Sequence, residues 1–361
     1  MMEFGRAFRV GLFGTSHGPE VGVTIDGIPR GTPIDPARIQ AELDRRRPVG
    51  RRLATKRQEE DRLCIDAGVV DGRSDGSRFR AHVANDDVRR EPYDRIRDTP
   101  RPGHADYPAR VRYGASADLS GGGIFSGRMT VGLVIAGSIA RRMLEAKGIS
   151  IAAFTRSIGG IEAEVPESLS LSEIAGRSAQ NEVGTPDPAA AQRMEEAIGA
   201  ARRDGDSLGG VIEVRATGVP VGLGEPFFDS IEGVIAHAAF SVPAVKAIEF
   251  GAGFSAARMR GSEHNDPFAV RDGRIVTESN HAGGILGGLA TGMPIVYRVA
   301  VKPASSIARP QRTVHLTDRT SADLVVTGRH DPCIVPRAVV VLEGVTAFAL
   351  ADLALLGGFL S

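Results

Sequence analysis

The chain has 361 residues, 42% of them hydrophobic, and its 44 basic side chains balance 44 acidic ones. This length and apolar content predict one large core, and the balanced charge argues against nucleic acid or a membrane surface as a partner. The two cysteines, Cys64 and Cys333, cannot form a disulfide framework, and the first residues lack the apolar run of a signal peptide. We therefore expect a cytoplasmic protein.

Short apolar runs bounded by turn residues predict β-strands along the whole chain, at residues 8–13, 21–25, 64–69, 149–154, 211–217 and 295–301. Apolar periodicity and end signals, such as Asp187-Pro188 at a start and Gly148 at an end, predict helices. These helices cover residues 129–147, 188–204, 231–240 and 338–360. Strands and helices do not alternate regularly and no linker divides the chain, so we expect a single layered α+β domain over residues 1–361.

The last predicted helix, residues 338–360, is long enough to cross a membrane. It contains Glu343 and Asp352, each of which would cost about 2.5 to 3.5 kcal/mol in the hydrocarbon core. We therefore expect a helix buried in the protein rather than a membrane span.

Polar clusters separate these elements. The first, "FGTSHGPEVG", places Ser16 and His17 between glycines at a strand end, where a histidine is either an acid/base group or a structural one. The second is "LDRRRPVGRRLATKR", which Pro48 and Gly50 break into a loop. Because no aromatic residues lie in it, a clamp for a small polyanion is favoured over a nucleic-acid patch. Its cations are Arg45, Arg46, Arg47, Arg51, Arg52, Lys56 and Arg57.

The third cluster, "RPGHADYPARVRYG", holds Arg101, His104 and Asp106, and indicates either an anion contact beside an acid/base group or a surface turn. The fourth joins "SNHAGGILGGLATG" to "VKPASSI". Its glycine-rich backbone, with Lys302 and two serines, suits the phosphate of a flavin or nucleotide.

The fifth cluster, "TGRHDPCIVPRAVVVLEG", places Arg329, His330 and Asp331 before the last helix, where an aspartate can also be a helix cap. No His-x-x-x-His or His-Glu-x-x-His spacing occurs, so a metal centre is not predicted, and a hydrolase is not predicted either. Arginines, isolated histidines and phosphate-type loops together predict an enzyme for a small, multiply negative substrate.

Eight blocks in this chain resemble the chorismate synthase family in their order and cover essentially the whole sequence. They read "GTSHGPEVGVTIDGIPRG", "DRRRP", "RPGHADYP", "GDSLGG", "GVPVGLGEP", "SNHAGGILGG", "KPASSI" and "GRHDPC". The resemblance implies helices sandwiched between antiparallel sheets and a homotetramer. It also implies a carbon-oxygen lyase of the shikimate pathway, which removes phosphate from 5-enolpyruvylshikimate 3-phosphate by anti-1,4-elimination to give chorismate, and which requires reduced FMN.

The resemblance also assigns site residues. His17 would be the acid facing the leaving phosphate, His104 would protonate the reduced flavin at N1, and Asp331 would act with flavin N5 in removing the ring proton. The implied substrate-binding residues are Ser16, Arg46, Arg52, Arg101, Arg128 and Arg329. The implied flavin-binding residues are Ser126, Gly127, Ala244, Gly287, Lys302, Ser305, Ser306 and Arg329.

The chain departs from the family pattern near the expected site. Thr15 stands where the family has glutamate, and Ile124, Phe125 and Met129 stand where arginine, serine and glutamate are common. One alternative is therefore the same elimination on shikimate 3-phosphate, which lacks the enolpyruvyl arm. A second alternative is a flavin-binding protein or flavin reductase without elimination activity. No dinucleotide fingerprint is visible, so the sequence leaves open whether NADPH or an external reductase reduces the flavin.

Overall fold

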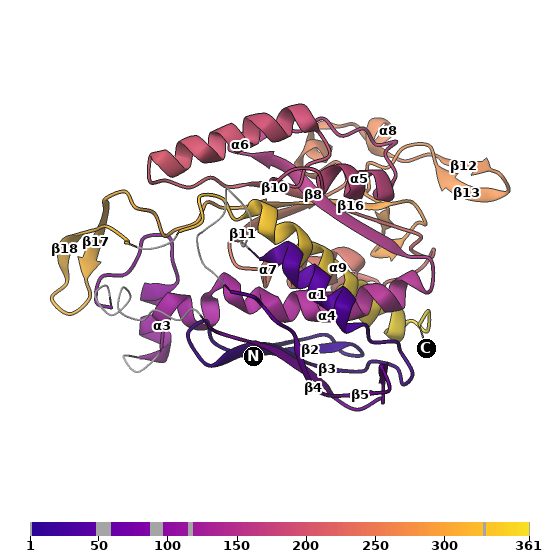
Figure 1. Cartoon of the computed structure of the whole chain (residues 1–361). Helices are drawn as coiled ribbons and strands as arrows, with labels where there is room; N and C mark the ends of the chain where they lie inside the picture. Colours follow the sequence, from indigo (N-terminus) through magenta and orange to yellow (C-terminus); the bar gives the residue numbers. More distant parts are fainter. Residues whose placement is uncertain (1, 48–58, 87–96, 115–117, 328–329, 361) are drawn as a thin grey trace.

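The computed structural model describes residues 2–47, 59–86, 97–114, 118–327 and 330–360. These residues form two five-stranded antiparallel sheets with long helices packed between them (Figure 1). This arrangement confirms the α+β sandwich, with helices between antiparallel sheets, that the sequence and the resemblance predicted.

The first sheet is built from the N-terminal part of the chain. Its strand order is β1 (Glu3–Phe4), β2 (Arg9–Gly14), β3 (Glu20–Asp26), β7 (Phe79–Ala84) and β4 (Cys64–Ala67). Along β7, Phe79, Ala81 and Val83 are buried, and they alternate with less buried residues. One face of this sheet therefore lies on the core, as the period of two requires. The strand expected at 64–69 ends early because Gly68 has a φ of +87°, and β5 (Val69–Val70) pairs with β6 (Arg73–Ser74) in a separate sheet.

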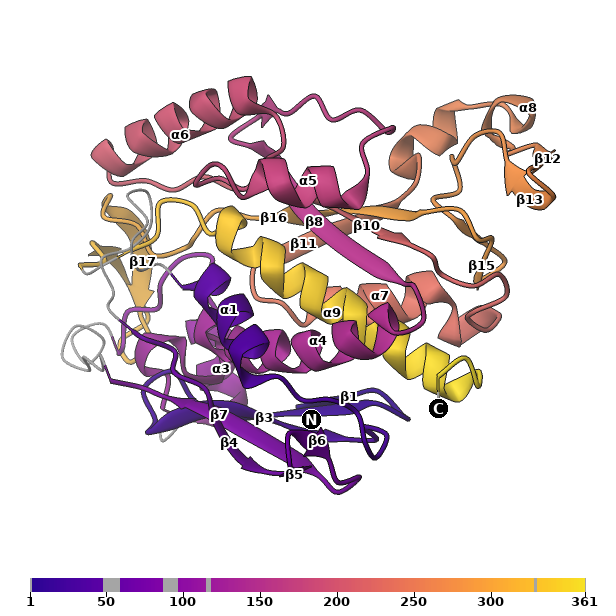
Figure 2. The same ribbon diagram turned by 45° about the vertical axis from the view of Figure 1, so that its right-hand side comes forward.

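The second sheet has the order β11 (Val245–Phe250), β16 (Ile295–Val301), β10 (Gly210–Thr217), β8 (Ser150–Ile158) and β9 (Ile161–Glu162). Helices α5 (Leu171–Ser178) and α6 (Pro188–Arg203) lie on its far side, away from the central helices (Figure 2). Helix α6 begins as predicted: the Asp187 side chain accepts hydrogen bonds from the backbone N–H groups of Ala189 and Ala190.

The helical layer consists of α1 (Pro36–Arg46), α4 (Thr130–Glu145), α7 (Ile231–Phe240) and α9 (Val335–Leu356). Two glycines allow α4 and α9 to approach closely, because a Cβ atom at Gly137 would lie 2.1 Å from Cα of Gly344. Helix α9 begins and ends earlier than the expected 338–360, since Pro336 occupies its first turn and Gly357 follows its last residue.

Among the described residues, α9 is the one helix whose length and hydropathy would allow a membrane span, but 89% of its most apolar window is buried inside the protein. Its two acidic residues are both satisfied. Glu343 pairs with Arg45 at 2.6 Å and with Arg141 at 3.1 Å. Asp352 accepts hydrogen bonds from three backbone N–H groups of residues 6–8. The prediction of a buried helix is confirmed.

Several smaller elements were not predicted. They are α3 (Asp106–Tyr113), α8 (Gly261–His264), and the hairpins β12–β13 (Phe268–Arg271, Arg274–Thr277), β14–β15 (Ile285–Leu286, Leu289–Ala290) and β17–β18 (Gln311–His315, Thr320–Leu324). Four short 3-10 turns complete the described part: η1 (Ser120–Phe125), η2 (Gly127–Met129), η3 (Phe227–Asp229) and η4 (Gly253–Arg258).

Candidate active site

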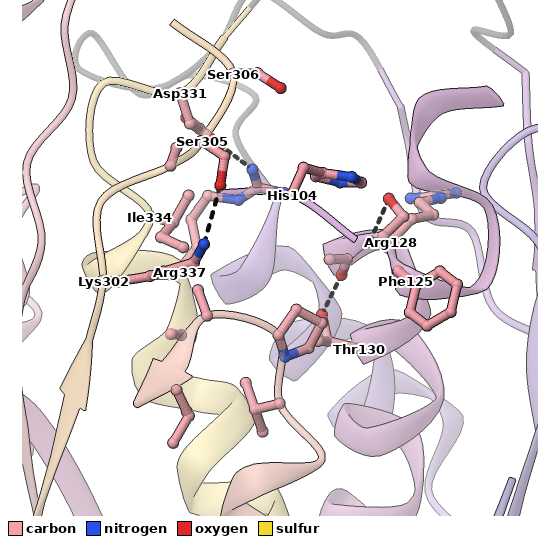
Figure 3. A pocket seen from close by; sticks show the side chains of 18 of the residues that line it. His104, Phe125, Arg128, Thr130, Lys302, Ser305, Ser306, Asp331, Ile334 and Arg337 are labelled. Atoms are coloured by element: carbon pink, nitrogen blue, oxygen red, sulfur yellow. Dashed lines mark hydrogen bonds and ion pairs between the residues drawn. The ribbon is translucent and has the colours of Figure 1, made fainter. Parts of the chain in front are cut away.

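A cavity of about 670 Å³ opens where the start of α9, the turns before α4, the α7–β11 turn and the segment after β16 meet (Figure 3). Its walls bring together eleven of the site residues that the resemblance assigned. These are Arg46, Arg101, His104, Ser126, Gly127, Arg128, Ala244, Lys302, Ser305, Ser306 and Asp331. Four of the five sequence clusters therefore contribute to one site.

Three consecutive glycines lie beside the two predicted histidines, and the first of them, Gly121, lines the cavity. Gly121, Gly122 and Gly123 have φ values of +60°, +94° and +54°, a conformation that glycine adopts without strain. A Cβ atom at Gly121 would lie 2.0 Å from His17 Cε1, and one at Gly122 would lie 3.3 Å from His104 Nε2. His104 itself lines the cavity, whereas His17 lies behind Gly121.

Ser16 orients the buried ring of His17. The Ser16 hydroxyl donates to the Ser120 carbonyl at 3.0 Å and also lies 3.0 Å from His17 Nδ1. Because the single hydroxyl proton is used on Ser120, this geometry assigns the Nδ1 proton to His17 as the donor to Ser16.

Asp106, in the first turn of α3, holds Arg101 and His104 together. Its carboxylate accepts hydrogen bonds from Arg101 Nε at 2.7 Å and Nη2 at 2.8 Å, and lies 2.6 Å from His104 Nδ1. Burial alone would raise the pKa of Asp106, but the hydrogen bonds from Arg101 and His104 outweigh it and lower that pKa. The pair on His104 Nδ1 leaves the Nε2 side of the ring toward Gly122 and the cavity.

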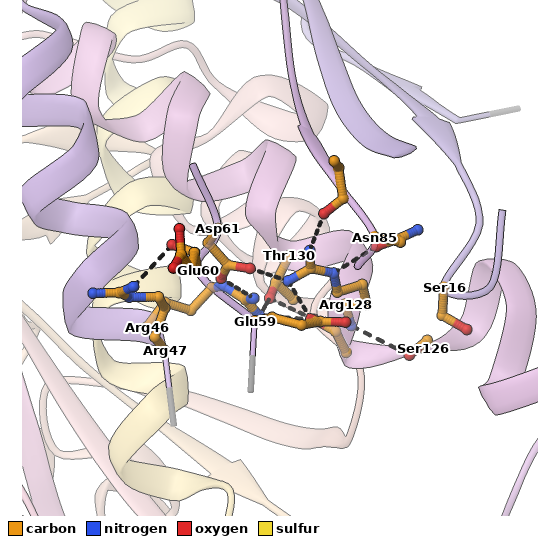
Figure 4. A network of polar contacts seen from close by, with 12 residues as sticks. Ser16, Arg46, Arg47, Glu59, Glu60, Asp61, Asn85, Ser126, Arg128 and Thr130 are labelled. Atoms are coloured by element: carbon orange, nitrogen blue, oxygen red, sulfur yellow. Dashed lines mark hydrogen bonds and ion pairs between the residues drawn. The ribbon is translucent and has the colours of Figure 1, made fainter. Parts of the chain in front are cut away.

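Arg46 and Arg128 share one buried carboxylate, that of Asp61 (Figure 4). Arg46 Nη2 donates to Asp61 Oδ2 at 2.7 Å, and Arg128 pairs with Asp61 Oδ1 and with Glu59 at 2.6 Å. Burial, together with repulsion from Arg337 and Arg128, lowers the pKa of Arg46 to about 10 although Asp61 opposes this. Its buried Nε has no hydrogen-bond partner in the described part of the chain. An anion in the cavity would relieve both penalties.

Lys302 and the serines after it form a polar shelf on the opposite wall. The Lys302 ammonium donates to the Gly103 carbonyl and to Ser305 Oγ, the latter at 3.0 Å, and Arg101 reaches Ser306 Oγ at 3.2 Å. Burial and the charge of Lys246 lower the pKa of Lys302, so a negative group here would be stabilising. The backbone carbonyl of Ala244, a residue with a φ of +74°, accepts from Lys302 N at 2.9 Å.

Asp331 lies at the cavity edge and pairs with Arg337, which the sequence did not single out. Asp331 is not the helix cap that was the alternative interpretation, because Ile334 occupies the cap position of α9 and makes no side-chain cap bond.

Some predicted residues are not in this cavity or cannot be placed. Arg52 and Arg329 lie outside the described residues. Gly287 lies exposed in the turn between β14 and β15, and neither it nor the rest of the "SNHAGGILGG" block lines the cavity. The block lies beside the start of β16, where Val296 N donates to the Gly283 carbonyl, whereas Lys302 of the cavity follows the end of this strand. The flavin contact expected of Gly287 stays a prediction.

The departures from the family pattern fall in different places. Ile124 and Phe125 line the cavity and give this part of its wall an apolar surface. Met129 is buried in the core. Thr15 does not line the cavity, and its carbonyl accepts a hydrogen bond from Asn85 at 3.0 Å.

Sequence reasoning also missed the carboxylates Glu59 and Asp61. They follow the arginine-rich cluster in "QEEDR", so the signal was a short acidic run beside a basic one. Such runs are usually solvated faces, and only the fold shows that these side chains are 5% and 2% exposed.

Cationic side chains, the histidine His104 and the carboxylate of Asp331 around one cavity, on a sandwich of two sheets and central helices, define an enzyme that acts on a small polyanion. A family model described as chorismate synthase matches residues 8–355. The chain therefore belongs to the chorismate synthase family, whose members are carbon-oxygen lyases.

Individual relatives agree with this family assignment. The chain is 50% identical over 349 residues to the chorismate synthase of Korarchaeum cryptofilum, with 97% of this chain and 96% of that protein covered. It is 48% identical over 358 residues to that of Methanosarcina mazei, with 99% and 97% covered. A crystal structure of chorismate synthase superposes with a TM-score of 0.78 at 30% identity and covers 98% of this chain and 93% of that chain.

Proposed function

We propose that this chain converts 5-enolpyruvylshikimate 3-phosphate into chorismate by 1,4-elimination of phosphate, with reduced FMN as cofactor. The observation that carries the proposal is the convergence of arginines, acid/base side chains and a phosphate-type shelf on one cavity. The family membership and the names of the relatives support it.

The cavity residues fit a flavin phosphate. Lys302, Ser305 and Ser306 offer an ammonium and two hydroxyls within one short segment, and the lowered pKa of Lys302 indicates an uncompensated cationic site. Ser126, Gly127 and Ala244 line the adjoining walls, and the expected contacts of Gly287 and Arg329 stay predictions. When bound, reduced FMN supplies electron density that eases the departure of an allylic phosphate.

The arginines of the cavity bind and orient the substrate's charged groups. Arg46, Arg101 and Arg128 are 3%, 6% and 4% exposed, so their guanidinium groups are fixed by protein contacts before an anion arrives. Such preorganised donors stabilise developing negative charge without reorganisation. Arg52 and Arg329 stay predicted contributors.

Three side chains carry out the proton transfers of the proposed reaction. Asp331 accepts the ring proton from its place at the cavity edge. His17 serves as the acid for the leaving phosphate, and its ring lies against Gly121, which lines the cavity. His104 lines the cavity beside Gly122 and is the group assigned to protonate the reduced flavin.

Assembly as a homotetramer and a cytoplasmic location belong to the same proposal. Support for self-association comes from large apolar side chains that a single chain leaves in water, including Phe227, Phe228 and Phe254, at 89%, 96% and 80% exposure. Light scattering coupled to gel filtration measures the assembly. A monomer at micromolar concentration would refute the tetramer but would not bear on the proposed reaction.

The reaction is tested anaerobically with chemically reduced FMN, offering 5-enolpyruvylshikimate 3-phosphate and shikimate 3-phosphate in separate arms. We expect stoichiometric phosphate and chorismate from the first substrate only. If phosphate were released from shikimate 3-phosphate and not from 5-enolpyruvylshikimate 3-phosphate, the substrate would be the one that lacks the enolpyruvyl arm. Flavin turnover with NADPH and no phosphate release from either substrate would identify a flavin reductase. The same NADPH arm shows whether the chain reduces its own flavin.

A further inference from the structure

Arg337, in the first turn of α9, links two parts of the active site. One guanidinium nitrogen, Nη1, pairs with Asp331 Oδ2, and Nε donates to the backbone carbonyl of Arg46 at 3.0 Å. The Arg337 side chain is 22% exposed and lines the cavity (Figure 3).

Residues 330–332 lie in no helix or strand, so side-chain contacts contribute to fixing the carboxylate of Asp331. The backbone beyond it is held where Leu208 N donates to the Pro332 carbonyl at 2.8 Å. The Asp331 side chain is held by Arg337, which stands on a 22-residue helix whose residues are mostly buried. The orientation of the Asp331 carboxylate therefore depends on a side chain that is anchored on a long, mostly buried helix.

We propose that Arg337 is a positioning residue that sets the Asp331 carboxylate for removal of the substrate's ring proton. The inference rests on the proposed function, in which Asp331 is the base. In that step the carboxylate takes the proton, the C–H electron pair forms a new double bond, the existing double bond shifts, and phosphate leaves with the C–O electron pair. Small displacements of a base are costly because proton transfer requires hydrogen-bond distance.

Arg337 also contacts a residue of the expected substrate-binding group, through the backbone carbonyl of Arg46. Arg46 belongs to the pair of guanidiniums on Asp61. Arg337 therefore ties the base to the end of α1, where the substrate's anionic groups are expected. Through these two contacts, Arg337 couples the position of the base to that of the end of α1.

The test uses Arg337→Gln and Arg337→Lys, with Arg38→Lys as the matched control. Arg38 makes an ion pair of similar exposure with Glu145, at 2.7 and 2.6 Å, but it lies outside the cavity. Each variant is assayed with reduced FMN and with substrate carrying hydrogen or deuterium at the ring position that loses its proton. Circular dichroism and thermal unfolding verify the fold.

We expect kcat of Arg337→Gln to fall about 10- to 100-fold with KM changed less than about threefold, and the deuterium isotope effect on kcat to rise. Arg337→Lys, which keeps the charge but loses the two-point contact, should lie between Arg337→Gln and wild type. Arg38→Lys should match wild type. Adding Arg337→Gln to Asp331→Asn should cost little more, since the two residues act as one unit.

An unchanged kcat, or a lower kcat with an unchanged isotope effect, would overturn the positioning role. A raised KM with normal kcat would show instead that Arg337 binds a substrate anion. Failure of the proposed function is distinguishable, because the wild-type chain would then release no phosphate before any variant is compared.

Discussion

The ring of His17 lies directly against the backbone of Gly121: a Cβ atom on Gly121 would come within 2.0 Å of His17 Cε1. Any side chain at position 121 must displace the imidazole. The glycine therefore determines where the predicted acid sits relative to the cavity.

Gly121→Ala should lower kcat about 10- to 100-fold, because a displacement of the order of 1 Å misaligns a catalytic group. The matched control is Gly160→Ala, which has a φ of +82° like other left-handed glycines but no atom within 4 Å of its Cβ position. Steady-state kinetics with reduced FMN compares the two variants. Equal activities would mean that backbone strain, not the His17 contact, explains any loss.

Asp61→Asn should destabilise the protein by about 3 to 5 kcal/mol, because it leaves Arg46 and Arg128 facing each other in a buried site without their shared charge. Urea-induced unfolding measures the loss. Asp26→Asn, which removes a largely exposed pairing with Arg78, should cost about 1 kcal/mol or less. Similar losses for both variants would refute a special role for Asp61.

The free energy of unfolding should fall as the pH is lowered, in part because the Glu343 carboxylate becomes protonated. Burial alone would raise the pKa of Glu343, but the charges of Arg45 and Arg141 outweigh it, so that its pKa lies below the ordinary 4.5. A group with a lowered folded pKa adds stability above its unfolded pKa and loses it as pH falls through the folded value. Glu343→Gln should therefore be less stable at neutral pH and lose less stability between neutral pH and about pH 3. Parallel unfolding free energies across this range would contradict the prediction.

Lys302→Gln should weaken FMN binding about tenfold or more, since it removes a charge-assisted hydrogen bond worth about 1.5 to 3 kcal/mol. Quenching of flavin fluorescence gives the dissociation constant directly, without turnover. Lys147→Gln changes the same charge in the exposed turn after α4 and should leave binding as in wild type. If Lys302→Gln bound FMN with the wild-type affinity, Lys302 and the serines after it would not be part of the flavin site.

Local signals in the sequence predicted much of the fold because they act over a few residues. Asp187 followed by proline starts α6 as expected, and strand β16 has the predicted bounds of Ile295–Val301. Helix α1 was not predicted, because its last residues belong to the arginine-rich cluster. In the structure, Arg45 of that cluster forms ion pairs with Glu42 and Glu343.

The sequence by itself determined the α+β class and the buried character of the last helix, since these follow from its pattern of apolar and charged residues. The resemblance carried by its ordered motifs added the arrangement of the layers and eleven residues of the cavity wall. Only the tertiary structure decided which charged side chains form ion pairs. Asp61 joins Arg46 to Arg128, and Arg337 joins Asp331 to the end of α1. Such pairings leave no periodic trace in the sequence, because their energies arise from burial and direct contact, which exist only after the core has formed.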